Sequence, residues 1–400
     1  MHRLAALLSL EEAQGRILER VAPLPAEQVP VAEAAGRVLA EAATAQIDLP
    51  PFDASAMDGF ALRSEDAPGR LPVVERIAAG RPASRELQAG EAMAIATGGA
   101  VPQGADVVVP LEDVVSEDNE IEIREPVDQG ANVRPRGGDL RRSDVVVPAG
   151  ARLGAAQLGA LAAAGIAEIS SARRPRAAVL STGSELRRPG EELAPGQIYE
   201  ANGVLLAAQL RSVGARVQPL EPVADDEPAH RAALDAGLEA DVLVSSGGVS
   251  VGPHDLVRSV GAELGIEEVL WGVAVKPGKP LWFGVRGRTL VFGLPGNPVS
   301  ALVCFEVFVR PALLALQGAA DPLPRYEPGK LARGLRPNPV RAEFVRARST
   351  VVDGEVELEV LTGQESHMIA RAAGADALVL IPAGEAELPA RAPVSFLRLA

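Results

Sequence analysis

Two closely spaced lysines are the side chains of this sequence best suited to holding an anion. The chain has three lysines, and two of them, Lys276 and Lys279, lie in the segment Lys276–Pro280, where proline and glycine stiffen the backbone. A lysine ammonium is a compact point charge, whereas arginine, which supplies the other cations, is a planar fork. The pair therefore indicates a loop that binds a small multivalent oxyanion. A solvated basic turn is the competing interpretation.

Glycine-rich turns follow three of the predicted strands. The turns are Ser181–Glu185, Ser245–Ser250 and Gly293–Pro298. In open α/β sheets, ligands bind at the carboxyl ends of the strands. Glycine lets backbone N–H groups approach an anion closely. One such turn is weak evidence, because connections between strands and helices often need glycine, but three at one sheet edge favour an anion site.

A helix is predicted to begin at Asn297-Pro298 and to run over Val299–Leu316. Asparagine is favoured at the N-cap and proline at the first helical position. The positive end of such a helix attracts phosphate-like groups. Ser300 lies in the first turn and adds a hydroxyl. A capped helix without a ligand is the alternative.

Six carboxylates beside glycines or at the ends of predicted elements are candidates for catalysis or metal binding. They are Asp58, Asp139, Glu185, Asp225, Asp226 and Asp255. Protein-bound Mg²⁺ uses one or two carboxylates together with waters and substrate phosphates. Glu185 and Asp255 follow glycine turns and are our first choices for the metal. Helix capping or surface solvation explains any single one equally well, and the sequence does not decide between Asp225 and Asp226.

The hydrophobic pattern divides the chain into four parts. Residues 48–143 read as a β-rich domain inserted into a connecting domain that is formed by residues 1–47 and 144–172. Residues 173–323 alternate strand and helix, which predicts a doubly wound α/β domain with a parallel sheet. Residues 324–400 return to short strands and predict a small β-barrel, with a hairpin turn at Asp353-Gly354. The fold class is therefore α/β plus β in a multidomain chain.

The expected strands of the α/β domain are Ala177–Ser181, Arg216–Pro219, Val242–Ser245, Val269–Ala274 and Thr289–Phe292. The expected helices are Gly203–Val213, Ala229–Leu238, Asp255–Leu264 and Val299–Leu316. A further amphipathic helix is expected near the N-terminus, where Ser9 and Glu12 form a capping box.

Composition limits the classes of function. The net charge of −14 and the pI of about 5.0 argue against a general nucleic-acid binder. The single cysteine, Cys304, lies in an apolar run and is expected to be a packed core thiol. We expect no signal peptide and no segment long and apolar enough to span a membrane. The simplest location is the cytoplasm.

Taken together, these motifs resemble the molybdopterin molybdenumtransferase family, which includes MoeA and the E domain of gephyrin. The resemblance covers essentially the whole chain. The matching blocks, in order, are Phe52–Ala61, Thr97–Gly99, Asn132–Arg134 with Asp139, Ser181–Leu186, Ser245–Gly252 with Asp255, Lys276–Pro280, Gly293–Ser300, and Phe344–Arg346 with Ser366–Met368.

The resemblance implies the last step of molybdenum cofactor assembly. Adenylyl-molybdopterin and molybdate would react to give the molybdenum-molybdopterin cofactor, AMP and water, with Mg²⁺ as cofactor. It also implies an elongated homodimer, in which the inserted domain of one subunit completes the site on the α/β domain of the other.

The resemblance also implies roles for individual residues. The catalytic set is Asp58, Thr97, Arg134, Asp139, Glu185, Asp225 and Asp255, with Glu185 and Asp255 as metal ligands. The molybdate set is Lys276, Lys279, Ser300, Arg346 and Ser366. The set for adenylyl-molybdopterin is Thr182, Gly183, Ser246, Gly247, Gly248, Ser250, Gly296, Asn297 and Pro298.

Three positions depart from the family pattern. Phe60 stands where tyrosine is common, Ser184 replaces a frequent aspartate, and Glu200 replaces another. Three other functions remain alternatives: a molybdopterin adenylyltransferase, a non-catalytic interaction scaffold, and a hydrolase or amidase built on the same α/β domain. The long N-terminal region and the C-terminal β domain argue against the first. The full set of anion motifs favours chemistry over a scaffold, and the central position of the α/β domain argues against the last.

Overall fold

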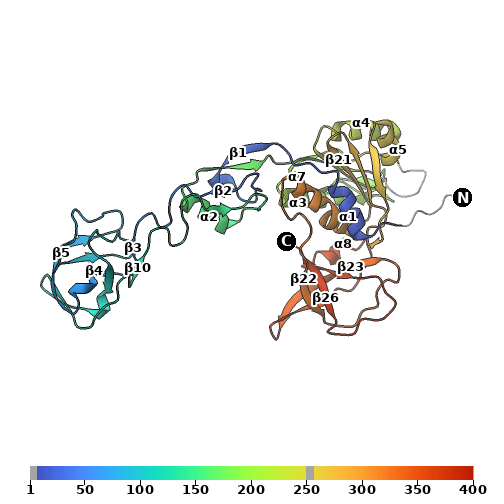
Figure 1. Cartoon of the computed structure of the whole chain (residues 1–400). Coiled ribbons are helices and arrows are strands. Elements are labelled where there is room, and N and C mark those ends of the chain that lie inside the picture. Colours follow the sequence, from blue (N-terminus) through green and yellow to red (C-terminus); the bar gives the residue numbers. More distant parts are fainter. Residues whose placement is uncertain (1–6, 249–255, 400) are drawn as a thin grey trace.

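The chain is elongated. A computed structural model describes residues 7–248 and 256–399. Figure 1 shows the β-rich insertion at one end of the molecule, the connecting strands in the middle, and the α/β domain with the C-terminal barrel at the other end. The multidomain fold class is confirmed, while the exact borders of the four parts remain a prediction.

The sheet of the α/β domain has six strands in the spatial order β16-β13-β17-β21-β20-β18. Their bounds are β16 Arg216–Pro219, β13 Arg176–Ser181, β17 Val242–Ser246, β21 Thr289–Leu294, β20 Trp282–Arg286 and β18 Glu267–Trp271. The first four are parallel, but β20 and β18 run antiparallel to their neighbours. The prediction of an all-parallel sheet was therefore wrong at this end. The reason is the two-residue hairpin Gly287-Arg288, with Gly287 at φ +60, which turns the chain directly from β20 into β21.

Helices cover both faces of this sheet, as the doubly wound prediction requires. One face is covered by α1 (Leu10–Leu18), α3 (Asn202–Ser212), α6 (Pro298–Cys304) and α7 (Arg310–Leu316). The other face is covered by α4 (Glu227–Gly237) and α5 (Leu256–Glu263). The predicted capping box at the start of α1 is present, and the apolar stripe of α1 packs on the α/β domain of its own chain.

One long helix runs from Pro298 to Leu316 and contains a π-helical turn, Phe305–Val309, between α6 and α7. The side chain of Gln14 in α1 donates a hydrogen bond of 2.8 Å to the carbonyl of Val307 in this turn. By length and hydropathy the helix could cross a membrane, but it carries Glu306 and Arg310 and so is not the run of about 20 uncharged apolar residues whose absence was predicted. Its most apolar window is 78% buried inside the protein, as expected for the central helix of a domain core.

The middle of the molecule is built from two short antiparallel pairs. β1 (Ala26–Pro30) pairs with β12 (Glu168–Ala172), and β2 (Ala43–Thr44) pairs with β11 (Val145–Val147). Helix α2 (Ala155–Ala163) and a 3₁₀ turn (Val31–Glu33) pack on them. Each pair joins a strand before the insertion to a strand after it.

The insertion contains a six-stranded sheet in the order β7-β4-β6-β5-β9-β8. The bounds are β4 Gly59–Leu62, β5 Gly69–Ile77, β6 Ala92–Ile95, β7 Val107–Pro110, β8 Val115–Glu117 and β9 Glu120–Ile123. Two 3₁₀ turns, Ser64–Asp66 and Leu111–Asp113, connect its strands. A separate pair, β3 (Ala54–Ser55) and β10 (Val133–Arg134), lies where the chain enters and leaves it.

The C-terminal part is a closed barrel of five strands. The closed order is β23-β24-β22-β26-β25, with β25 pairing back to β23. The bounds are β22 Glu327–Leu331, β23 Ala342–Val352, β24 Glu355–Val360, β25 Ala377–Ile381 and β26 Pro393–Arg398. The predicted hairpin at Asp353-Gly354 is confirmed, since both residues have positive φ and Val352 pairs with Glu355. A short helix, α8 (Ile369–Ala372), lies between β24 and β25.

The barrel is joined to the α/β domain in two ways. The short strand β19 (Val275–Lys276) leaves the α/β domain and pairs in parallel with β23. In addition, Phe344 and Leu378 on the barrel are buried in the same hydrophobic cluster as α6 and α7. The barrel therefore lies against the helix whose N-terminus is expected to face the ligand.

Candidate functional site

The three glycine turns lie side by side at one edge of the sheet, as predicted. Ser181 at the end of β13 is level with Ser246 at the end of β17, which is level with Leu294 at the end of β21. The turns are also bonded to one another: the N–H of Thr182 donates to the carbonyl of Ser246, and the N–H of Gly247 donates to that of Leu294. Short strands β14 (Leu186–Arg187) and β15 (Ile198–Tyr199) follow the first turn.

Two of the predicted glycines are required by the close packing of these turns. Gly247 and Gly248 have φ of +93 and +66, a region that side chains with a Cβ rarely adopt. A Cβ on Gly247 would lie 2.6 Å from the hydroxyl oxygen of Thr182. Glycine at these two positions therefore lets the second turn pack directly against the first turn. Ser250, predicted for the same turn, lies outside the described residues.

Asn202, which sequence reasoning did not select, bridges two of the turns. Its side-chain amide donates to the hydroxyl of Ser246 and to the carbonyl of Gly296, both at 2.7 Å. Asn202 is the first residue of α3 and follows Tyr199 and Glu200 closely. A polar residue where a helix begins after a strand is the sequence signal that could have identified Asn202 as a site residue.

Helix α6 begins at Asn297 and Pro298, as predicted, and its N-terminus is in direct contact with the barrel. The amide of Asn297 donates to the hydroxyl of Ser366 at 2.8 Å, and the N–H of Val299 donates to the carbonyl of Ser366 at 3.0 Å. Ser300 is 5% exposed in the first turn of the helix. Three residues assigned to anion binding, Asn297, Ser300 and Ser366, therefore lie together.

Arg346 lies directly behind this contact. Its guanidinium donates to the carbonyl of Gly363 at 2.7 Å and to that of Glu365 at 3.4 Å, and so fixes the segment that presents Ser366. The side chain of Arg346 is almost completely buried. Burial lowers the pKa of the guanidinium from its usual value, and the charge of Glu365 opposes that shift. The structure thus shows that Arg346 holds in place the segment that leads to Ser366.

The loop with the two lysines is anchored between the same helix and the barrel. Gly278 has φ +128, and its carbonyl faces the thiol of Cys304 in α6 at 3.7 Å. The ammonium of Lys276 forms an ion pair of 2.8 Å with Glu343 on β23, a partner that the sequence did not suggest. Lys279 is exposed, and no carboxylate among residues 7–248 and 256–399 pairs with it. Lys279 is therefore a cation left available for a ligand.

Cys304 is fully buried, as predicted, and burial raises the pKa of its thiol to about 12.

The structure separates the roles of the two neighbouring aspartates. Asp226 is the N-cap of α4, where its carboxylate accepts a bond of 3.0 Å from the N–H of Ala229. Asp225 instead faces the first glycine turn and accepts bonds from the hydroxyl and the N–H of Ser184. Ser184, which stands where the family often has aspartate, thus holds the carboxylate of Asp225 in place. Glu185 is exposed beside it.

The structure describes only part of the predicted metal site, because Asp255 lies outside the described residues. Within the described part of the chain, no three side chains of His, Cys, Asp or Glu form a group that would enclose a metal.

Four predicted catalytic residues lie in or beside the insertion. Asp58 accepts bonds of 2.7 and 3.1 Å from the N–H and hydroxyl of Thr97. Arg134 is exposed on β10, and Asp139 is exposed in the segment that returns to the connecting strands. Figure 1 shows the insertion at the opposite end of the molecule from the α/β domain. Within one chain, these residues and the glycine turns are therefore not brought together.

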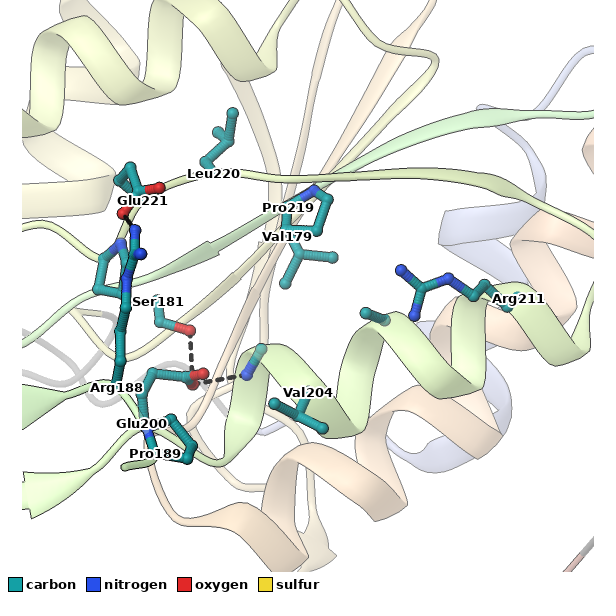
Figure 2. Close-up of a pocket in the computed structure, with 13 residues that line it drawn as sticks. Val179, Ser181, Arg188, Pro189, Glu200, Val204, Arg211, Pro219, Leu220 and Glu221 are labelled. Atoms are coloured by element: carbon teal, nitrogen blue, oxygen red, sulfur yellow. Dashed lines mark hydrogen bonds and ion pairs between the residues drawn. The ribbon is translucent and has the colours of Figure 1, made fainter. Parts of the chain in front are cut away.

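The two other departures from the family pattern have structural explanations. Phe60 is 6% exposed in the core of the insertion, where it needs no hydroxyl partner. Glu200 is buried and accepts bonds from the hydroxyl of Ser181 at 2.8 Å and the N–H of Gly203 at 2.6 Å. It lines a cavity of about 440 Å³ beside the first glycine turn (Figure 2).

A doubly wound domain with glycine turns at one sheet edge, a helix N-terminus and an available lysine defines a protein class that binds phosphorylated or otherwise anionic ligands. Comparison with known families is more specific. Residues 8–165 match the MoeA N-terminal region (domains I and II), residues 178–315 a probable molybdopterin binding domain, and residues 328–399 the MoeA C-terminal region (domain IV).

Relatives along the full length agree. The chain is 37% identical over 398 residues to molybdopterin molybdenumtransferase 2 of Mycobacterium tuberculosis, covering 96% of this chain and 97% of the relative. It is 36% identical to the molybdopterin molybdenumtransferase of Haemophilus influenzae over 90% of this chain and 91% of that one. A crystal structure of the MoeA protein from Pyrococcus horikoshii OT3 superposes with a TM-score of 0.85 at 28% identity, covering 98% of this chain and 100% of that one. This chain belongs to the MoeA family of molybdopterin molybdenumtransferases.

Proposed function

We propose that this chain converts adenylyl-molybdopterin and molybdate into the molybdenum-molybdopterin cofactor, AMP and water. The chain is a transferase that inserts molybdenum in molybdenum cofactor biosynthesis. This conclusion rests on its 36–37% identity, over most of the chain, to molybdopterin molybdenumtransferases. The adenylylated substrate, the Mg²⁺ requirement and the residue roles are our proposal. They are supported by the row of glycine turns and by the contact of Ser366 with the start of α6.

In this proposal, molybdate lies between the lysine loop and the N-terminus of α6. Binding in the micromolar to millimolar range requires about 4–8 kcal/mol. A charge-assisted hydrogen bond contributes about 1.5–3 kcal/mol. Lys276, Lys279 and the groups at the helix start can together supply this after desolvation losses, whereas no single group can. The position of Ser366 on Asn297 places a hydroxyl beside the same helix end.

The residues beside the first glycine turn fit Mg²⁺ better than a metal that needs a full protein cage. Glu185 is exposed there and Asp225 faces the turn, so the protein offers one or two carboxylates, which is what Mg²⁺ uses when substrate phosphates supply further ligands. When bound, Mg²⁺ would offset the charge of the phosphoanhydride and of the departing AMP. The backbone N–H groups of the turns would hold the phosphates in register with the molybdate.

We also propose that the active unit is a homodimer in the cytoplasm. Asp58 and Thr97 are bonded to each other at the surface of the insertion, at the far end of the chain from the glycine turns. A second copy that brings its insertion to those turns would supply the missing carboxylate, hydroxyl and guanidinium groups. The long apolar helix is mostly buried inside the protein, so it gives no reason to place the protein in a membrane.

The function is tested by incubating the protein with adenylyl-molybdopterin, Mg²⁺ and molybdate, and measuring AMP release together with molybdenum-loaded cofactor. We expect both products, in equal amounts, only when molybdate is present. Consumption of ATP with metal-free molybdopterin would instead identify an adenylyltransferase. Binding of a peptide partner without turnover would identify a scaffold.

The shared site is tested by mixing two variants at a molybdate concentration near the wild-type half-saturation point, where Asp58→Asn and Lys279→Ala are each expected to be nearly inactive alone. Asp58→Asn alters the insertion and Lys279→Ala alters the lysine loop, so a mixed dimer has one unaltered site if each site uses both chains. Random exchange makes half of the dimers mixed, and each has one working site of two, so about a quarter of the wild-type rate should return. No recovery after verified subunit exchange would show that each chain works alone.

A further inference from the structure

The ion pair between Lys276 and Glu343 is not used by any step above. Strand β19 pairs in parallel with β23, and their register places Lys276 level with Glu343. Residues that are level on neighbouring strands point to the same face of a sheet. The pairing of the two strands therefore brings the ammonium to 2.8 Å from the carboxylate, at the junction of the α/β domain and the barrel, where Figure 1 labels β23.

The two partners of this ion pair differ in their access to water. The side chain of Glu343 is 13% exposed, whereas that of Lys276 is 43% exposed. Among the described residues, Lys276 is the only partner of the Glu343 carboxylate. A carboxylate that is largely withdrawn from water is stabilised by an opposite charge and is costly without one. Glu343 therefore keeps the ammonium of Lys276 paired, while the exposed side of that ammonium stays open to a ligand.

The pair leaves the two lysines of the loop in different electrostatic states. The charge of Lys276 is balanced by Glu343, whereas Lys279 has no carboxylate partner in the described part of the chain. An ammonium has three N–H donors, so Lys276 can bond to Glu343 and to an oxyanion at the same time. The carboxylate and the oxyanion would then lie on either side of one ammonium and repel each other. A dianion therefore gains less from Lys276 than from Lys279.

We propose that Glu343 sets the affinity for molybdate: it competes with the oxyanion for Lys276 and keeps molybdate loosely bound in the lysine loop. This inference rests on the proposed function, which assigns Lys276 to molybdate. An interaction that stabilises the bound substrate more than the transition state lowers KM and slows the reaction. The reaction transfers molybdenum from molybdate to molybdopterin, so two unopposed ammonium charges on the substrate would hinder the transfer. Glu343 removes one of them.

A residue that only positions Lys276 would act with the opposite sign. If Glu343 served to orient the ammonium toward molybdate, the loss of its charge would weaken molybdate binding. If Glu343 competes for the ammonium, the loss of its charge strengthens molybdate binding. The sign of the change in affinity therefore decides between the two roles.

The test measures the Kd of sodium molybdate by equilibrium dialysis of the full-length protein, with bound molybdenum quantified by mass spectrometry. Glu343→Gln keeps the size of the side chain and removes its charge. Glu355→Gln is the matched control, because it removes a carboxylate that pairs with the third lysine, Lys330, and changes the net charge equally. We expect Glu343→Gln to bind molybdate at least about fivefold more tightly than wild type, and Glu355→Gln to stay within about twofold of wild type.

Two further measurements separate competition from a general effect on the fold. Glu343→Asp, which keeps the charge, should bind molybdate more weakly than Glu343→Gln. In the insertion assay, Glu343→Gln should show a lower half-saturating molybdate concentration together with slower AMP release at saturation. A saturating rate equal to that of wild type or higher would overturn the claim that loose binding favours the transfer.

Equal or weaker molybdate binding by Glu343→Gln, with a melting temperature that verifies its folding, would overturn the proposal. The absence of binding to both Glu343→Gln and wild type at millimolar molybdate would overturn it as well. The insertion assay on the wild type gives a separate answer about the function. Molybdate-dependent AMP release without tighter binding by Glu343→Gln rejects the role of Glu343 and leaves the function standing, whereas tighter binding without AMP release by the wild type does the reverse.

Discussion

The most informative substitution is Lys279→Ala, because Lys279 is exposed and has no carboxylate partner among the described residues. Its truncation leaves no charge unpaired and removes no buried contact, so the fold should be unaffected. If the ammonium binds molybdate, its loss removes one charge-assisted hydrogen bond of about 1.5–3 kcal/mol. That free energy corresponds to a loss of molybdate affinity of about 10- to 150-fold.

The assay is the molybdate dependence of AMP release at a fixed concentration of adenylyl-molybdopterin. We expect the half-saturating molybdate concentration to rise by this factor, while the affinity for adenylyl-molybdopterin stays within about twofold. The third lysine supplies the control, because Lys330 pairs with Glu355 on the barrel, and Lys330→Ala removes the same side chain away from the loop. A molybdate dependence of Lys279→Ala that matches wild type would refute the assignment of this loop to the oxyanion.

Three further predictions concern stability and reactivity. Gly278→Ala should destabilise the protein by at least about 2 kcal/mol in urea unfolding, because φ of Gly278 is +128 and a Cβ would lie 2.6 Å from the sulfur of Cys304. The control is Gly15→Ala, where a Cβ meets nothing within 4 Å and should not destabilise the protein. Equal urea midpoints for Gly278→Ala and Gly15→Ala would contradict this prediction. Burial opposes ionisation of the Asp241 carboxyl, but Arg173 and a backbone N–H outweigh burial and hold the pKa of Asp241 below its ordinary value. The stabilisation by ionised Asp241 is therefore present above about pH 4 and is lost as the pH falls through the lowered pKa. Asp241→Asn should reduce the free energy of unfolding by about 1–3 kcal/mol at pH 7 and by less at pH 3, and a reduction independent of pH would count against this account. The thiol of Cys304, with its pKa raised to about 12 by burial, should resist iodoacetamide at pH 8 in the native protein and react once urea unfolds it, so rapid native labelling would show that the helix opens.

Much of the fold follows from local sequence signals. The hairpin at Asp353-Gly354, the capping box of α1 and the start of α6 at Asn297-Pro298 were predicted where the structure has them. Each depends on residues within a few positions of one another, so the sequence alone is sufficient. The three glycine turns could also be placed at one edge, because consecutive strands of a doubly wound sheet end on the same side.

The parts that were missed depend on partners far apart in the chain. The antiparallel strand β20 is too apolar and too short to be distinguished from a helix segment or a buried loop, and only its pairing with β21 identifies it. The ion pair of Lys276 with Glu343 joins residues 67 positions apart, across the contact between the α/β domain and the barrel. The bridge from Asn202 to Gly296 and the contact of Asn297 with Ser366 have the same character. No pattern of neighbouring residues in the sequence predicts such contacts.

The most direct test of where molybdate binds is anomalous diffraction at the molybdenum absorption edge, using crystals of the protein soaked with molybdate. The account predicts one dominant peak beside the start of α6, within hydrogen-bonding reach of the Lys279 ammonium and the Ser366 hydroxyl. A dominant peak elsewhere, with this position empty at saturating molybdate, would contradict it.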